Sequence, residues 1–595
     1  MVRRDTPNSP RTLCANANKV LKRRNCEALM ISLFALLSLF LLCRTALGLD
    51  GQQSSPGWLT PGQGRRGAVS SLDSRCTAVG IEILSSGGNA ADAAVGVQFC
   101  LGVVGLHLTG IGGGGFMLVR SDNGTYEFID FRETAPAASF EAMFDGNTNA
   151  SIFGGSASGI PGEVQGLHQL HTKYGRLPWA KLVAPAVKLA ESGFVIGKDL
   201  GYYMDLLNKD DVFLSPAWAP DFAPRGIRLR AGDLMTRKRY ARVLQAIAER
   251  GPEAFYTGPV AKSTVKALAD ADGIMTLEDL RQYKALSRPP RSITYKNFRI
   301  TSCGAPTSGI VVLKILKTIL GYDGVGDPGS INLTTHRLDE AIRFAYGART
   351  KLGDPDFIKG AEDYQLSMLS DETAAETRSK ILDNQTQPVE AYNPDGIESL
   401  ETPGTSHVSV ADASGLAVSL TSTVNLLFGS LLMDRETGIL MNNEMNDFSL
   451  PNSTNAFGYI PSSSNYIKPG KRPFSSISPV IVEHLSNGTL YLVTGAAGGS
   501  RIITATTQSL WNVLDRSMNL HQAVVEPRFH DQLVPNKMVF ENAFDDSRIA
   551  FLKSRGHDIG VLEHGSDLQM VRHLYDGIFE AASETRQQDS AGMVA

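Results

Sequence analysis

The chain has 595 residues, of which 42% are hydrophobic and 20% charged, and its formal net charge is −4. This composition is typical of a globular protein with a large core, and it excludes disordered, collagen-like and polytopic membrane proteins. No long run of Lys or Arg occurs beyond the extreme N-terminus, which argues against a nucleic-acid-binding protein. Length alone predicts three or four domains.

The first fifty residues are predicted to direct targeting. Residues 28–43 are apolar and uncharged and follow a basic stretch, which predicts a signal anchor over residues 28–49 behind a cytosolic segment, residues 1–27. The chain would then be a single-pass type II membrane protein of the secretory pathway, with its folded part extracellular or vacuolar. The alternative is a secreted protein whose signal peptide is cleaved near Ala46-Leu47-Gly48. Residues 50–66 form a polar linker rich in Gly, Pro and Ser.

Six Asn-X-Ser/Thr sequons agree with a secretory compartment. They lie at Asn123, Asn149, Asn332, Asn384, Asn452 and Asn487. Those at Asn123 and Asn487 belong to Asn-Gly-Thr turns, which are typical of exposed hairpins.

Three cysteines lie beyond the apolar segment, at Cys76, Cys100 and Cys303. An oxidising compartment permits one disulfide among them. Cys76 and Cys100 are the better pair, since each lies on a predicted helix and the two helices are joined at Gly87-Gly88. The alternative is three buried free thiols.

From about Gly67, helices alternate with short strands. The patterns predict helices over 77–84, 90–102, 164–173, 179–191, 238–250 and 259–271, and strands over 116–120, 126–130 and 298–302. Residues 384–405 are rich in Asn, Gln, Pro and Gly, which indicates an exposed loop and the part of the chain most open to cleavage.

The glycine run at residues 110–115, GIGGGG, contains a G-x-G-x-x-G pattern. A dinucleotide-binding loop needs a strand before its glycines and a helix after them. Here a helix precedes and a strand follows, so the pattern does not indicate a dinucleotide site. The P-loop, G-x-S-x-G and H-E-x-x-H motifs are missing from the sequence. We therefore expect neither a cofactor nor a metal site.

Thr405 follows a glycine at the head of a predicted β-hairpin. Residues 406–411 and 417–422 flank the turn 412–415, Asp-Ala-Ser-Gly. Folding about Ser414 sets Thr405 opposite Thr423 and gives one face made only of hydroxyl and imidazole groups. On that face His407 lies opposite Thr421 and Ser409 opposite Ser419; on the aliphatic face Val408 lies opposite Leu420 and Val410 opposite Val418. The polar face is either exposed to solvent or part of a site.

Groups suited to binding charge lie on both sides of this hairpin. Arg132 and Glu133 end a strand, where a fixed guanidinium could clamp a carboxylate. Gly498 and Gly499 precede a predicted helix that Ser500 caps, so their N–H groups could hold an oxyanion. An acidic pair and a serine pair complete the set: Glu444, Asp447, Ser475 and Ser476. Taken singly, each feature is more often a solvated charge, a salt bridge or a tight turn.

Eight motifs together resemble the γ-glutamyltransferase family, in order and over nearly all the chain from residue 67. They are GGNAADAAV, GIGGGGF, IDFRETAP, GTSHVSV, TSTVN, NNEMNDF, RPFSSISP and GAAGGS. The resemblance implies an α+β fold, the αββα sandwich of N-terminal-nucleophile hydrolases. It also implies autocatalytic cleavage between Gly404 and Thr405 into a large subunit, 67–404, and a small subunit, 405–595, that form one interlocked domain. This overrides the domain number expected from length.

The resemblance also implies a role for each site residue. Thr405 would be the nucleophile, with its freed amine as base, and Thr423 would support its hydroxyl. The α-carboxylate of a γ-glutamyl group would be bound by Arg132, Ser475 and Ser476, and its α-ammonium by Asn425, Glu444 and Asp447; Glu133 is counted with these substrate-binding residues. Gly498 and Gly499 would form the oxyanion hole. The expected donors are glutathione and its conjugates, and the expected acceptors are amino acids, dipeptides or water.

One position departs from the family pattern. Many members carry an aromatic residue two positions after the asparagine that matches Asn425, and here that residue is Leu427. The balance between hydrolysis and transfer is therefore left open. A competing interpretation is another hydrolase of the same fold, such as a cephalosporin or glutaryl acylase, although the predicted α-carboxylate and α-ammonium ligands argue against it. A second is a membrane-anchored glycoprotein that keeps the fold without processing or catalysis.

Overall fold

The computed structural model describes residues 65–392, 404–451, 461–562 and 565–595, and two antiparallel sheets form its centre. The first sheet runs in the order β18 (Ala591–Val594), β1 (Gly67–Ser71), β9 (Gly404–Asp412), β10 (Ala417–Asn425), β2 (Gly114–Arg120), β3 (Tyr126–Phe131) and β6 (Leu286–Arg288). The second runs in the order β17 (Phe579–Ser583), β16 (Asp567–His573), β12 (Leu490–Ala497), β11 (Val480–His484), β8 (Phe298–Cys303) and β7 (Pro290–Tyr295). Strands β9 and β10 pack against β12 of the second sheet.

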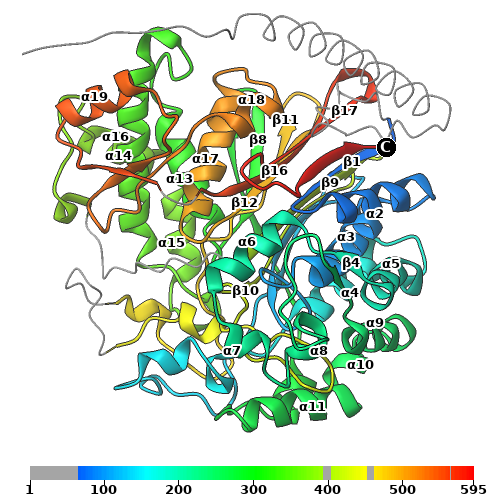
Figure 1. Ribbon diagram of the computed structural model, residues 1–595. Coiled ribbons are helices and arrows are strands. Elements are labelled where there is room, and N and C mark those ends of the chain that lie inside the picture. The colour runs from blue at the N-terminus through cyan, green and yellow to red at the C-terminus, as the bar shows by residue number, and fades with distance from the viewer. Residues whose placement is uncertain (1–64, 393–403, 452–460, 563–564) are drawn as a thin grey trace, which may run out of the picture. The chain divides into compact units, whose positions relative to one another are not determined.

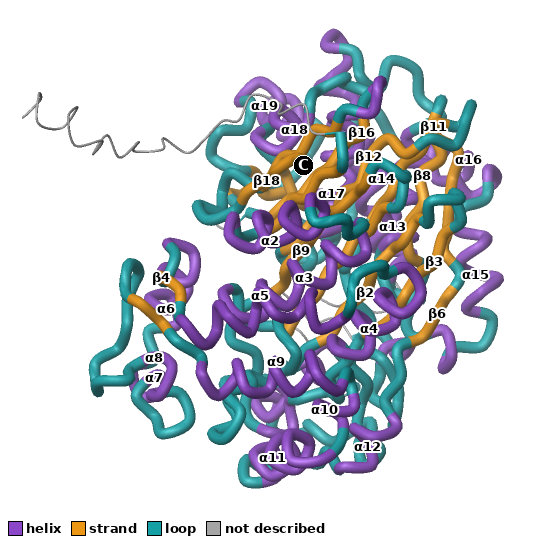
Figure 2. The backbone as a smooth tube through the Cα atoms, turned by 90° about the vertical axis from the view of Figure 1, so that its right-hand side faces the viewer, coloured by secondary structure: helices purple, strands orange, loops and turns teal. Residues whose placement is uncertain are grey.

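Helices cover the outer face of each sheet. The first sheet is covered by α2 (Ser74–Ser85), α3 (Ala90–Val104) and α4 (Glu163–Tyr174), with α5 (Trp179–Ser192) and α9 (Lys238–Arg250) outside them. The second is covered by α13 (Gly309–Ile319), α17 (Arg501–Leu514) and α18 (Leu520–Val525), and α14 (Ile331–Arg349) packs on α13. The two helical layers flank the sheets in Figure 1, and Figure 2 views α2, α3 and α5 in front of the strands. The α+β sandwich is thus confirmed.

The remaining elements are short or peripheral. They are α6 (Lys198–Leu207), α7 (Asp210–Phe213), α8 (Ala219–Phe222), α10 (Glu253–Tyr256), α11 (Gly258–Ala269), α12 (Leu277–Gln282), α15 (Ala361–Met368), α16 (Asp371–Lys380) and α19 (Asp546–Ser554). Two small sheets comprise β4 (Phe194–Val195) with β5 (Leu234–Met235), and β13 (Phe529–His530) with β14 (Met538–Phe540) and β15 (Ile559–Val561).

All six predicted helices and three predicted strands are present, with ends that differ by up to three residues. Helix α2 begins at Ser74 rather than Thr77, because the Asp73 side chain accepts a hydrogen bond from the Arg75 N–H and caps it. A capping box of Asn89 and Asp92 begins α3, all of whose fifteen residues are buried. Ser500 does precede α17, but its side chain forms no capping bond, so this part of the prediction was wrong.

The predicted hairpin has the register expected, from Thr405 opposite Thr423 to Val410 opposite Val418. Its aliphatic face packs in the core beneath α3. Its polar face is buried against the second sheet, where Ser409 and Ser419 donate to backbone carbonyls of β16 and β12. Burial lowers the pKa of His407 to about 3, so its ring is neutral. Exposure to solvent, one of the two alternatives for this face, is excluded.

The glycine run 110–115 serves close packing beside this hairpin. A side chain at Gly113 or Gly115 would overlap the carbonyl oxygens of Thr423 or Thr421 on β10. Gly112 approaches the carbonyl of Leu440 in the same way. These glycines let β2 and the loop before it lie directly against the strand that carries Thr423.

Segments from both sides of the 404–405 bond contribute strands to both sheets, and they alternate in the first. Strands β9 and β10, which follow that bond, lie between β1 and β2, which precede it. In the second sheet β11 and β12 lie beside β8. The two segments therefore form one interlocked core.

Cys76 and Cys100 form a disulfide between α2 and α3, and Cys303 is a buried free thiol, as predicted. Asn123 and Asn487 lie in exposed hairpin turns, and Asn149 and Asn384 are also exposed. Asn332 is half-buried on the first turn of α14. Asn452, the predicted anchor, residues 50–64 of the linker and residues 393–403 of the predicted loop lie outside the described residues. Within the described ranges, the structure contains no helix with the length and apolarity required to cross a membrane.

Candidate active site

A small, partly open cavity lies where β9 and β10 meet the loop before α17. Its wall contains nine of the eleven residues predicted for the site, namely Arg132, Thr405, Thr423, Asn425, Glu444, Asp447, Ser475, Ser476 and Gly499. Ile477 and Ile502 complete it. The two remaining predicted residues, Glu133 and Gly498, are adjacent in sequence to wall residues but do not line the cavity. The structure thus brings together groups from five separated stretches of the chain, at 132, 405–425, 444–447, 475–477 and 499–502.

The hydroxyls of Thr405 and Thr423 lie beside the peptide bond between Gly404 and Thr405. Thr423 Oγ1 donates a hydrogen bond to the Gly404 carbonyl oxygen at 2.6 Å and accepts one from the Asn425 N–H at 2.7 Å. Thr405 Oγ1 lies 3.4 Å from Thr423 Oγ1. A hydrogen bond to the carbonyl oxygen stabilises the negative charge that appears there when a nucleophile attacks the carbonyl carbon. The geometry thus activates this one bond of the backbone.

Gly404 is required by close backbone contacts. A side chain here would meet the carbonyl oxygens of Leu426 and Asn425, the latter at 2.5 Å. Asn425 has a φ of +75°, and the ladder between the two strands shifts register between Thr423 and Asn425. This bulge brings the backbone of β10 over the 404–405 bond.

Arg132 lies just after β3 and is enclosed by carboxylates. Its guanidinium forms ion pairs with Glu444 and Asp447, and its Nη1 lies 4.0 Å from Glu133 Oε2. All four side chains are buried. One guanidinium among three carboxylates leaves an excess of negative charge. Burial, opposed by Arg132, raises the pKa of Glu133 to about 7 and that of Glu444 well above its usual range.

This arrangement differs from the separate roles that the sequence analysis gave these residues. Arg132 was expected at the α-carboxylate of a ligand, and Glu444 and Asp447 at its α-ammonium. The structure pairs Arg132 with both acids directly. Their assignment to opposite ends of a ligand stays a prediction.

A set of buried bonds fixes the position of Arg132. Tyr283 donates its hydroxyl to the Arg132 carbonyl at 2.8 Å, and Arg472 donates to the same oxygen at 2.7 Å. Arg472 also pairs with Asp130, which accepts from the Arg132 N–H. The backbone of Arg132 is therefore held from three sides, so its guanidinium is presented in one place.

Among the neutral side chains of the cavity wall, Asn425 provides a hydrogen-bond acceptor that no other described residue uses. Asn425 donates its amide Nδ2 to the Asn443 carbonyl at 2.9 Å, while its Oδ1 has no hydrogen-bond partner among the described residues. On the opposite wall Ser476 Oγ accepts from Arg349 at 3.3 Å. A buried acceptor without a donor is costly, and a ligand ammonium would satisfy it.

Gly498 and Gly499 connect β12 to α17 with φ values of +123° and +63°. Both values lie where residues with a side chain are strained, which explains the paired glycines. The turn brings Gly499 to the cavity wall. Gly499 lies two residues before the start of α17, so its role in an oxyanion site stays a prediction.

Some contributing residues were missed from the sequence. Arg472 precedes the predicted serine pair by three positions, so its motif could have indicated it. Arg349 on α14 and Tyr283 carry no local signal, because an isolated residue on an ordinary element gives none. Ile477 and Ile502 were likewise not distinguishable from core residues.

Comparison with known proteins places this site in a family. The family model for gamma-glutamyltranspeptidase matches residues 76–594. The chain is 52% identical over 546 residues to a glutathione hydrolase proenzyme of Arthroderma benhamiae. The matched region covers 89% of this chain and 93% of that protein. It is 45% identical over 535 residues to a glutathione hydrolase of Aspergillus flavus, with 89% of each covered.

Among solved structures, the cephalosporin acylase of Bacillus halodurans superposes with a TM-score of 0.80 at 25% identity, covering 92% of this chain and 99% of that one. The acylase supports the sandwich fold and does not by itself separate acylase from transpeptidase. The family model and the two fungal relatives make that distinction. This chain belongs to the gamma-glutamyltranspeptidase family.

Proposed function

We propose that Thr405 is the nucleophile of a γ-glutamyltransferase with glutathione hydrolase activity, and that it becomes free by autocatalytic cleavage of the Gly404–Thr405 bond. The observation that carries this proposal is the Thr405–Thr423 pair beside the Gly404 carbonyl, at the wall of a cavity that contains the charged residues. The enzyme cleaves the γ-glutamyl bond of glutathione and related compounds and transfers the group to water, an amino acid or a dipeptide.

Maturation begins with attack of Thr405 Oγ1 on the Gly404 carbonyl carbon. Thr423 donates its hydrogen bond to the developing oxyanion. The C–N bond then breaks, an ester joins Gly404 to the Thr405 side chain, and the hydroxyl proton passes to the new α-amine. Water hydrolyses the ester, which restores the hydroxyl and leaves Gly404 as a carboxylate terminus. Cleavage thus converts one precursor into two subunits, 67–404 and 405–595.

Turnover uses the same hydroxyl with the new amine as its base. Thr405 Oγ1 attacks the γ-carbonyl of the donor, and the backbone N–H groups of Gly498 and Gly499 stabilise the oxyanion. The cysteinylglycine amine of glutathione leaves with a proton. The γ-glutamyl ester on Thr405 is then resolved by water or by the amine of an acceptor, which returns the free hydroxyl.

The charged wall selects the γ-glutamyl headgroup. An α-ammonium placed at Asn425 Oδ1, Glu444 and Asp447 neutralises part of the excess negative charge and satisfies the unpartnered acceptor. The fixed guanidinium of Arg132 binds the α-carboxylate together with Ser475 and Ser476. A glutaryl or cephalosporin side chain lacks the ammonium, and this is the feature that favours a transpeptidase over an acylase here.

The location proposed from sequence has independent support. The Cys76–Cys100 disulfide and the exposed sequons at Asn123 and Asn487 fit a secretory compartment. The catalytic part is accordingly extracellular or vacuolar, held by the N-terminal segment or released from it. Leu427, half-buried near the site, replaces an aromatic residue of many relatives, and the hydrolysis-to-transfer ratio is the property it sets.

Three variants test the proposal. Thr405→Ala removes the attacking oxygen, so the chain stays in one piece and inactive. Thr405→Ser retains a hydroxyl and still cleaves. Ser406→Ala, the matched control, removes the next hydroxyl, which points to the opposite face of β9, and should leave both processing and turnover intact. The measurements are chain number on a denaturing gel, the N-terminal sequence of the small subunit and γ-glutamyl anilide turnover. Two chains from Thr405→Ala would refute the proposal.

A further inference from the structure

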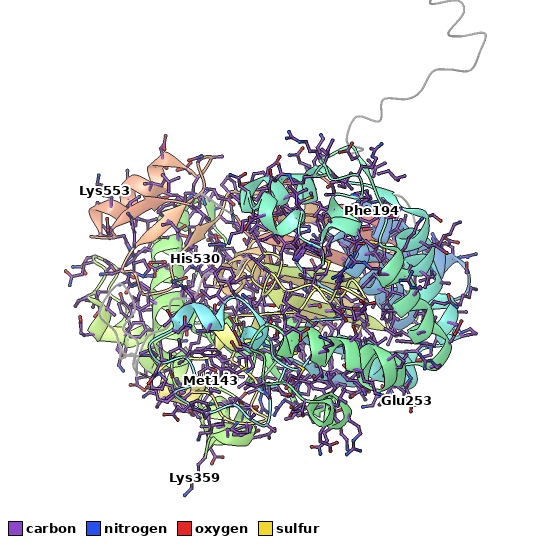
Figure 3. All side chains as sticks on the ribbon, turned by 60° about the horizontal axis from the view of Figure 1, so that its bottom comes forward. Met143, Phe194, Glu253, Lys359, His530 and Lys553 are labelled. Atoms are coloured by element: carbon purple, nitrogen blue, oxygen red, sulfur yellow. A yellow bond between two sulfur atoms is a disulfide. The ribbon has the colours of Figure 1, made fainter. Side chains whose placement is uncertain are left out.

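Two histidines and a glutamate meet at a second buried cluster, away from the cavity. His336 and Glu340 are one helical turn apart on α14, and His557 follows α19 by three residues. The three side chains are buried, and their ligand atoms lie within 4.8 Å of one another. Lys553 on the last turn of α19 extends outward at the surface (Figure 3), whereas His557 turns inward. The cluster joins a segment before the 404–405 bond to one after it.

The hydrogen bonds of His336 fix its tautomer. Its Nε2 lies 2.8 Å from the Leu382 carbonyl, which can only accept, so Nε2 carries the proton. Its Nδ1 therefore presents a lone pair when the ring is neutral. That lone pair faces His557 Nε2 at 2.8 Å.

His557 has an acceptor on its other side too. Its Nδ1 lies 3.2 Å from Asp339 Oδ2, and neither Asp339 oxygen has a hydrogen-bond partner among the described residues. Without a metal, one of the two rings can donate a hydrogen bond to the other across this contact. With a metal bound, a proton on His557 Nδ1 that faces Asp339 would leave the Nε2 lone pair of His557 free to bind the ion beside His336 Nδ1.

Glu340 is oriented in the manner of a ligand. Thr386 Oγ1 donates to its Oε1 at 2.6 Å, and the Tyr392 hydroxyl lies 2.9 Å from its Oε2. Each of the three candidate ligands thus has a second partner that holds its orientation. Outer partners of this kind are characteristic of histidine and carboxylate metal ligands.

The charges around the cluster also call for a cation. Asp339, Glu340 and Asp531 are buried, and the buried Arg343 pairs with Asp531 at 3.0 Å. Asp339 and Glu340 form no ion pair with a Lys or Arg side chain among the described residues, so a bound metal ion would supply the cation that these carboxyl groups lack.

We propose that His336 Nδ1, His557 Nε2 and Glu340 bind a zinc ion that ties α14 to the segment after α19. Two imidazoles and a carboxylate are a donor set that zinc prefers over Mg²⁺ or Ca²⁺. Tetrahedral zinc with Zn–N bonds of about 2.0–2.1 Å separates its two nitrogens by about 3.3 Å, so the rings open by about 0.5 Å on binding. The fourth position is left for water, since Asp339 lies at Nδ1 of His557, on the other side of that ring.

The sequence could not indicate this site. An H-E-x-x-H motif places two histidines on one helix. Here one helix supplies His336 and Glu340, and the second histidine is 221 residues beyond His336. The zinc ion would stabilise the contact between the two segments without taking part in the reaction at Thr405. The inference stands whether or not the proposed cleavage occurs.

Metal analysis of the full-length protein tests the site directly. Protein purified without chelator, equilibrated with zinc sulfate and desalted should carry about one tightly bound zinc ion per chain by mass spectrometry. His336→Asn and His557→Asn should each lose it, while His484→Asn, a half-buried histidine on β11, should retain it. Cobalt in place of zinc should give visible d–d absorption bands in wild type that the first two variants lack.

A second measurement needs no variant. Because zinc binds the folded chain, the melting temperature of wild type in zinc should exceed that in a chelator by several degrees, and the two cluster variants should not show this difference. γ-Glutamyl turnover reports whether each variant is folded. A wild-type chain that binds no zinc, or a His557→Asn chain that binds as much as wild type, overturns the proposal and leaves a shared proton between the two rings.

Discussion

The two buried clusters have nearly the same charged composition. Arg132 lies among Glu133, Glu444 and Asp447, and Arg343 lies near Asp339, Glu340 and Asp531. Each has one guanidinium and three carboxylates. Three residues of the first cluster, Arg132, Glu444 and Asp447, line a partly open cavity, whereas the second cluster is buried and includes two imidazoles.

The difference shows how surroundings determine which cation a negative cluster accepts. Buried carboxylates in excess of their guanidinium are expensive, so each cluster is completed by added positive charge. A cavity with an unpartnered amide oxygen admits an organic ammonium. A closed site with two imidazole lone pairs admits only a metal ion or a proton. Similar charge sets therefore lead to a substrate site in one place and a structural site in the other.

Replacing the two arginines should have the largest and most contrasting effects. Arg132→Gln should lower kcat/KM for γ-glutamyl substrates on the order of 10³-fold, because the α-carboxylate loses its cation. Arg343→Gln should lower the free energy of unfolding by about 3–5 kcal/mol, because Asp531 is left buried without its partner, and should leave KM unchanged. Steady-state kinetics and urea unfolding of both variants distinguish these outcomes. If Arg132→Gln and Arg343→Gln lost turnover equally, the proposed difference between the two clusters would be wrong.

Asp447→Asn should break the selectivity of the active-site cluster. Wild type should prefer a γ-glutamyl anilide to the glutaryl anilide that lacks the ammonium. The variant should lose about 100-fold of that preference, or about 3 kcal/mol, because one of the carboxylates that face the ammonium becomes neutral. The ratio of kcat/KM for the two anilides is the measurement. A wild-type enzyme that turns over both equally would contradict the assignment of Asp447.

Thr423→Ala should slow both reactions of the Thr405 hydroxyl, autocatalytic processing and substrate turnover, without abolishing either. The change deletes the hydrogen bond to the Gly404 carbonyl, and a lost buried polar contact costs about 1–3 kcal/mol, or about 5- to 150-fold in rate. Processing followed on denaturing gels and turnover of the processed fraction give the two rates. Thr423→Ser serves as the control, since it keeps the hydroxyl. Unaltered processing in Thr423→Ala would exclude the role given to this hydroxyl.

Glu163 sharpens the comparison, because it is a buried carboxylate held by Gln98 and Ser422 rather than by a guanidinium. Burial raises its pKa from 4.5 to about 8. The unfolded chain loses this proton at lower pH than the folded chain, so stability falls as pH rises between these values, by about 1.4 kcal/mol per pH unit.

Glu163→Gln cannot release a proton and should show a slope shallower by that amount over the same range. Urea unfolding of wild type and variant at several pH values measures both slopes. Parallel curves for Glu163→Gln and wild type would show that Glu163 is ionised in the folded chain.

The parts of the molecule that sequence predicted well are those where contacts are local. Thr405 and Thr423 are 18 residues apart, and the period of two along each strand with the turn at 412–415 is sufficient to set their register. Helices such as α9 were found with their ends, because a 3.6-residue apolar period is a local property.

The long-range contacts could not be derived in this way. Arg132 and Asp447 are 315 residues apart, and no periodicity relates them. The family resemblance brought them into one site, but it did not predict that the acids would pair with Arg132 itself. His336 and His557 belong to no motif of that resemblance, so their meeting is visible only in the fold.

The alternation of strands in the first sheet has a consequence for the order of folding and cleavage. A small subunit made alone would expose β9 and β10 along both edges, where β1 and β2 belong. If the chain is cut between Gly404 and Thr405 as proposed, folding must precede the cut. Before such a cut, refolding after denaturation is a first-order process of one chain; after it, the two pieces must meet, so recovery would depend on concentration. The lifetime of the cut enzyme would then depend more on its rate of opening than on its equilibrium stability.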